Sequence, residues 1–116
     1  MTAIYDQGPL AVLFALVIIH AVADYPLQGA YMAQQKTRHQ ADSSSEWFVA
    51  LSAHCLIHAG GVWLITGNIY MGLIELVLHS LIDTGKSQNR YGLLVDQCLH
   101  VLCKVGYVIF WMIAGC

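Results

Sequence analysis

Apolar residues form four long stretches along the chain, and short polar segments separate them. The stretches cover residues 10–27, 47–66, 69–84 and 93–114, and none alternates with the two-residue period of a β-strand. A helix of about 20 apolar residues crosses roughly 30 Å of hydrocarbon, so each stretch is long enough, or nearly so, to be a membrane span. The pattern predicts an all-α membrane protein with one domain over residues 1–116, folded as an antiparallel four-helix transmembrane bundle.

Polar signals mark the expected ends of these helices. Ser43 and Glu46 have the spacing of a capping box before the second helix, and Asn68 can cap the third. Gly85 is expected to end the third helix in a left-handed conformation. Pro26 is expected to bend or end the first helix.

The composition agrees with a membrane protein. Of the 116 residues, 58% are apolar and only 10% are Asp, Glu, Lys or Arg, whereas soluble domains carry about 25% charged residues. This excludes a disordered segment, a disulfide-stapled secreted module and a soluble nucleic-acid-binding protein. The expected partner is membrane lipid rather than nucleic acid, and the composition leaves homo-oligomerisation open.

The basic residues outside the apolar stretches fall on one side of the expected bundle. They lie in the two segments that follow the first and third helices, and they are Lys36, Arg38, Lys86 and Arg90. By the positive-inside rule this side faces the cytoplasm. We therefore expect a multi-pass protein of the inner (cytoplasmic) membrane with both termini external.

Ionisable residues inside the apolar stretches follow a four-residue spacing. They are His20 and Asp24, His54 and His58, Glu75, His79 and Asp83, and Asp96 and His100. Residues four apart lie on the same face of a helix. At 1.5 Å per residue, all nine fall within about 15 Å of the cytoplasmic boundary, although the helices run in opposite directions. The pattern predicts one cluster near that side of the membrane.

Imidazole and carboxylate groups together are typical ligands of zinc, manganese and iron. Nine such residues are too many for one ion, so we expect two or three divalent ions, with zinc as the first choice. Residues that do not bind an ion directly would orient those that do. The alternative is a hydrogen-bonded polar core without metal, which would fix the helix register or relay protons.

Four motifs in this order resemble a known family. They are HAVADYPLQ at 20–28, HCLIH at 54–58, HSLIDTGK at 79–86 and DQCLH at 96–100. Together they resemble domain of unknown function 3307, a small membrane family of bacteria and phages with no established activity. More distantly, the helical pairs resemble membrane-bound metal-dependent hydrolases and the zinc-dependent phospholipase C group, which implies phosphodiester cleavage by a zinc cluster. That group also uses its N-terminal amine as a ligand, whereas Met1 is expected on the opposite side of the membrane.

The leading functional hypothesis is a membrane-embedded, metal-dependent hydrolase of phosphoric esters that acts on lipid or lipid-linked phosphate at the cytoplasmic leaflet. Glu75 or Asp24 is the expected general base. The residues expected to bind the substrate are Lys86, Arg90, Lys104, Gln28 and Gln97. Lys104 could instead neutralise Asp96. The alternative functions are a metal-ion or proton transporter or sensor, and a phage or host interaction protein with a structural metal.

Overall fold

The computed structural model describes residues 4–114, and within this range every regular element is a helix. The elements are a 3-10 turn η1 (Ile4–Gln7), α1 (Pro9–Asp24), α2 (Gly29–Gln35), α3 (Ser44–Thr66), α4 (Ile69–Ser87) and α5 (Leu93–Ala114). The all-α prediction is confirmed for these residues. Met1 and Cys116, which were expected outside the cell, lie beyond the described range.

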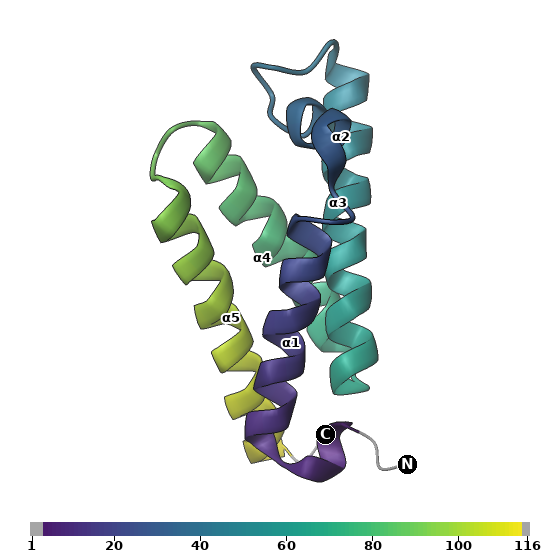
Figure 1. Ribbon diagram of the computed structural model, residues 1–116, viewed down its shortest axis with the longest axis vertical. Coiled ribbons are helices and arrows are strands. Elements are labelled where there is room, and N and C mark those ends of the chain that lie inside the picture. The colour runs from purple at the N-terminus through teal and green to yellow at the C-terminus, as the bar shows by residue number, and fades with distance from the viewer. Residues whose placement is uncertain (1–3, 115–116) are drawn as a thin grey trace.

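The four long helices run alternately up and down, and each packs against two of the others (Figure 1). Helix α1 contacts α3 and α5, and α4 contacts the same two helices. The short helix α2 and the α4–α5 turn lie at one end of the molecule, which we call the upper end. Apolar side chains fill the lower half, where the core comprises Val12, Leu16, Val62, Met71, Tyr107 and Val108.

Two helices, α3 and α5, are long and apolar enough to cross a membrane. Helices α1 and α2 form a third candidate if the pair is one span broken by its 88° bend. Helix α4 falls outside this set because it carries Glu75, Asp83 and Lys86. Length and composition therefore support two or three of the four predicted spans.

The first helix is shorter than predicted and is followed by a helix that was not predicted. It was expected to reach residue 27 but ends at Asp24. Tyr25 still donates its N–H to the carbonyl of Ala21, but Pro26 has no N–H to continue the hydrogen-bond series, which explains this end. Helix α2 then leaves at a steep angle, and it reaches α3 through the Tyr31 hydroxyl, which donates to the Glu46 carboxylate.

The predicted caps of α3 and α4 are present. The Ser43 hydroxyl oxygen accepts the backbone N–H of Glu46 at 3.1 Å, and the side-chain oxygen of Asn68 accepts the N–H of Tyr70 at 2.9 Å. Each contact satisfies one backbone donor that the first turn of a helix leaves free. Ser43 and Asn68 therefore fix where α3 and α4 begin.

The predicted end of α4 at Gly85 is wrong. The helix continues to Ser87, and the left-handed residue is Asn89, with φ 59°. Gly85 instead leaves room for the side chain of Tyr91, since a Cβ atom at residue 85 would lie 2.8 Å from the Tyr91 ring.

The Tyr91 hydroxyl donates to the carbonyl of Ile82. Its pKa is raised by partial burial and then by the charges of Asp96 and Asp83.

We expect Gly72→Ala to destabilise the protein by about 1–3 kcal/mol, because overpacking displaces neighbouring atoms. A Cβ at Gly72 would lie 2.9 Å from the carbonyl oxygen of Ala59 and 3.0 Å from the Cβ of Trp63, so α3 and α4 would have to separate. Gly60→Ala is the matched control. No heavy atom lies within 4 Å of a Cβ there, so this variant should gain about 0.5–1 kcal/mol. Thermal unfolding in detergent measures both, and equal shifts would contradict this packing.

Candidate metal centre

The nine polar residues predicted from their spacing meet in one buried group between the four long helices, which we call the polar cluster. Helix α1 contributes its last two turns, α3 its middle, α4 its middle and end, and α5 its beginning. All nine are buried except Asp24, whose side chain is 12% exposed. Because the helices alternate in direction, these segments lie at the same height in the upper half of the molecule.

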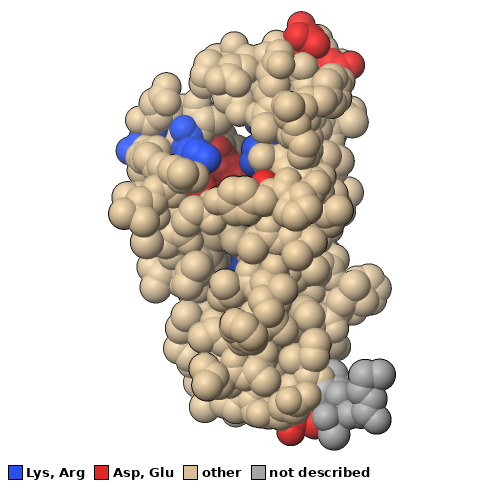
Figure 2. All heavy atoms as spheres, in the orientation of Figure 1, with Lys and Arg blue, Asp and Glu red and all other residues tan. Residues whose placement is uncertain are grey.

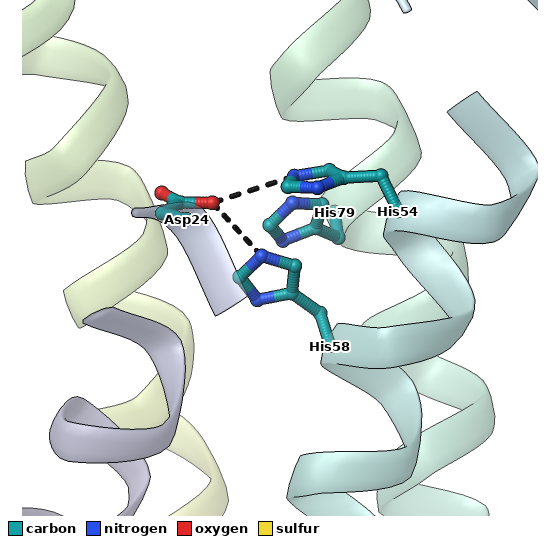
Figure 3. A group of neighbouring side chains, drawn as sticks. All are labelled: Asp24, His54, His58 and His79. Atoms are coloured by element: carbon teal, nitrogen blue, oxygen red, sulfur yellow. Dashed lines mark hydrogen bonds and ion pairs between the residues drawn. The ribbon is translucent and has the colours of Figure 1, made fainter. Parts of the chain in front are cut away.

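The largest set of adjoining ligand-type atoms combines Asp24, His54, His58 and His79 (Figure 3). One oxygen of Asp24 lies 2.8 Å from Nε2 of His58 and 3.3 Å from Nε2 of His54. The ring of His79 stacks on that of His58 with 3.7 Å between centroids. An ion bound tetrahedrally at 2.0–2.1 Å holds its ligand atoms about 3.3 Å apart. The atoms have the chemical type of metal ligands, and all four lie within 4.8 Å of one another.

Two further sets continue from the first. His20, His79 and His100 form one, and Asp83, Asp96 and His100 form the other. In each of the three sets the ligand atoms lie within 4.8 Å of one another. His79 belongs to the first and second sets, and His100 belongs to the second and third. The first and third sets share no residue, so they could hold two separate ions.

Among the described residues, several buried ring nitrogens of the cluster have no hydrogen-bond partner. They are Nδ1 of His20, His54 and His100, and Nε2 of His79. Most buried polar atoms in proteins are paired, so this concentration is unusual. Glu75 accepts Nδ1 of His79 at 3.2 Å, which leaves the lone pair of that ring on Nε2. Nε2 of His79 is therefore available as a ligand atom for a divalent cation.

Glu75 lies outside the three ligand sets because its carboxylate is already held by other side chains. It accepts from Lys104 and from the Tyr107 hydroxyl, each at 2.6 Å. Its remaining contact is with His79. Lys104, expected to bind substrate or to neutralise Asp96, is only 1% exposed and pairs with Glu75 on the lower side of the cluster.

Two adjoining pockets open from the polar cluster at the upper end. The inner pocket, about 80 Å³, is lined by Asp24, Asp83 and Asp96 together with Gln28 and Gln97. The outer pocket, about 210 Å³, lies between the segment after α2 and the end of α4. Figure 2 shows acidic and basic side chains facing each other in a hollow at this end.

A protein-family model matches residues 12–114, a range that includes the whole polar cluster. The chain belongs to the DUF3307 family. The description of DUF3307 is a protein of unknown function, so membership supports the first resemblance and brings no activity. No curated protein and no solved structure matches the chain. The likeness to hydrolases is not supported by these comparisons.

The pockets of this DUF3307 protein contain three of the five residues predicted to bind substrate. Lys86, Gln28 and Gln97 line the inner pocket. Lys104 does not, because it is buried against Glu75. Arg90 lines neither pocket and is exposed in the α4–α5 turn, because α4 extends past Gly85 and carries this residue outward.

Sequence reasoning missed Lys36 as a residue of the site and counted it only as a marker of the cytoplasmic side. Its ammonium group lies 3.2 Å from Asp83 and 3.3 Å from Nε2 of His54. The 88° bend between α1 and α2 makes this contact, since it folds the end of α2 over the cluster. Lys36 has no cluster residue four positions away, so no helical spacing could have indicated its place.

Proposed function

We propose that this protein is a membrane-embedded, metal-dependent hydrolase of phosphoric esters that acts on lipid or lipid-linked phosphate. The observation that carries the proposal is the position of the three ligand sets directly beneath two pockets bounded by Lys36 and Lys86. Clustered divalent ions stabilise the two oxygens of an in-line displacement at phosphorus. Lysine side chains beside them can neutralise the remaining phosphate oxygens.

In the hydrolysis, a water oxygen forms a bond to phosphorus, one ester P–O bond breaks, and the leaving alcohol takes up a proton. Bound divalent ions, with zinc as the first choice and manganese or iron as alternatives, supply Lewis acidity. Asp24 lines the inner pocket and is the better candidate for the base that accepts the proton of water. Glu75 is the weaker one, since it lines neither pocket, is 1% exposed and pairs with the buried Lys104. Gln28 and Gln97 can hydrogen-bond the phosphate from the pocket wall.

We place this site at the cytoplasmic leaflet of the inner membrane, with both termini external. The support is that α3 and α5 can span a bilayer, and that α2, the α4–α5 turn and their basic residues lie at the same end of the molecule as the pockets. Basic residues favour the cytoplasmic side. A lipid phosphate at that surface would reach the inner pocket without crossing the bilayer.

A transporter, the main alternative, needs a path from the cluster to the opposite end. In the described part of the chain, the Lys104–Glu75 pair closes the lower side of the cluster, and beneath it Leu16, Val62 and Met71 form part of a packed apolar core. The open side is the upper end. This one-sided access favours an enzyme over a transporter.

The hydrolase proposal predicts that purified protein, loaded with zinc or manganese in lipid nanodiscs, releases product from phosphate esters. A chelator should abolish the activity, and Asp24→Asn should lower it at least about a hundredfold, as expected for loss of a general base. Asp6→Asn is the control, because Asp6 is exposed in η1 at the far end. Failure of every lipid phosphate ester to react with metal-loaded protein, or metal uptake into vesicles, would contradict the proposal.

A further inference from the structure

The outer pocket is larger than the phosphate group of the proposed reaction requires. It shares Lys36, Asp83 and Lys86 with the inner pocket, so the two spaces adjoin along the wall that these side chains form. A phosphate in the inner pocket would therefore have one ester substituent directed toward the outer pocket. Its volume of about 210 Å³ lies below the roughly 300–1,000 Å³ of sites for drug-sized ligands, which indicates a small group.

The part of the outer pocket that is not shared consists of hydrogen-bonding side chains. They are Thr37, His39, Gln40, Ser87 and Asn89. The Thr37 hydroxyl donates to the carbonyl of Ala33 at 3.1 Å, and that of Ser87 donates to the carbonyl of Thr84 at 3.0 Å. Both hydroxyl oxygens thus keep lone pairs that can accept from a ligand.

The charges of the outer pocket favour a hydroxyl-rich group over a second phosphate. Its two ammonium groups, on Lys36 and Lys86, belong to the wall shared with the inner pocket, where the phosphate would use them, and Asp83 adds a negative charge 3.2 Å from Lys36. A second phosphate would need further cations there. A group with several hydroxyls instead matches the amide and hydroxyl side chains that line the rest of the wall.

The inner pocket also has an apolar rim at the ends of α1 and α5. Tyr25 and Leu93 line this pocket, and they are 65% and 56% exposed. Their neighbours Leu27 and Leu94 are exposed as well, at 53% and 78%. If α3 and α5 span a bilayer, this rim faces its interface, so a hydrocarbon chain attached to the phosphate could leave the pocket here.

We infer that the substrate is an amphiphilic phosphodiester. Its phosphate lies in the inner pocket, its hydrocarbon leaves past Tyr25 and Leu93, and its small hydroxylated headgroup occupies the outer pocket. The inference rests on the proposed function, which places phosphate at the inner pocket. A phosphomonoester lipid has no group for the outer pocket and is the poorer ligand.

Native mass spectrometry of metal-loaded protein tests this preference without requiring turnover. The probes are phosphatidylglycerol and phosphatidic acid with the same acyl chains, offered at equal concentration. Wild-type protein should retain phosphatidylglycerol in preference to phosphatidic acid. The variants His39→Ala, Gln40→Ala and Asn89→Gly should each lower this ratio about fivefold for one lost hydrogen bond. Ser45→Ala is the control, an exposed position outside both pockets.

Equal retention of the two lipids by wild-type protein would overturn the inference, and so would a preference that survives all three pocket variants. Asn89→Gly keeps the left-handed backbone at φ 59° available, so a change in this variant reports on the side chain. If the variants abolish the preference while no lipid is hydrolysed, the headgroup site stands and the hydrolase proposal fails. The two proposals are therefore tested separately.

Discussion

Replacing His79 with alanine should lower the amount of bound metal, because His79 belongs to two of the three ligand sets. The first set keeps Asp24, His54 and His58 without it, whereas the set with His20 and His100 keeps only two ligands. The set formed by Asp83, Asp96 and His100 does not include it. We expect wild-type protein to carry two or three ions and His79→Ala fewer than wild type, because the second set keeps only two of the three protein ligands that a zinc site needs. Elemental analysis after mild detergent extraction measures this directly.

Two matched variants make the His79 experiment specific. His39→Ala removes an exposed imidazole of the outer pocket that belongs to no ligand set, so its metal content should equal that of wild type. His58→Ala leaves Asp24, His54 and His79 in its set, so it should lose less metal than His79→Ala. Equal losses in His39→Ala and His79→Ala would refute the assigned site. A wild-type protein without transition metal would mean that the cluster is a hydrogen-bonded polar core.

The long helices and the polar cluster could be predicted because both depend on local spacing. Pairs such as His54 and His58 lie on one helical face wherever the helix packs. The short α3–α4 and α4–α5 connections then force these three helices to alternate, which brings their pairs to a common height, and residues 25–43 return the chain from α1 to the same end. The structure assembles all nine residues for this reason.

Helix α2 and the contacts of Lys36 and Lys104 could not be predicted, because they depend on tertiary packing that no local sequence pattern encodes. Helix α2 is only seven residues long, so its sequence gives little helical signal, and the contact of Lys36 with Asp83 follows from its steep angle to α1. The sequence also could not show which carboxylate pairs with Lys104. Asp96 lies two turns away on the same helix, but Glu75 on α4 is the carboxylate that it meets. The rotation of one helix against another decides such a choice.

Lys104→Met should destabilise the protein more than any change at its surface. Lys104 and Glu75 are both 1% exposed and lie 2.6 Å apart, so methionine would leave a buried carboxylate without its cation. Breaking a buried ion pair in this way costs about 3–5 kcal/mol. The Tyr107 hydroxyl still donates to Glu75 but brings no positive charge. Thermal unfolding in detergent should show a large fall, whereas Arg90→Met at the exposed turn should stay within about 0.5 kcal/mol of wild type.

The double variant Lys104→Met with Glu75→Gln separates the loss of charge from the loss of packing. Glutamine is neutral, so the buried charge is gone and most of the lost stability should return. Metal affinity should nevertheless fall in the double variant, because Glu75 also orients His79 through a contact of 3.2 Å. Loss of such an orienting carboxylate lowers metal affinity about 10–100-fold. Recovery of stability with full metal affinity would therefore show that Glu75 only balances the charge of Lys104 and does not position His79.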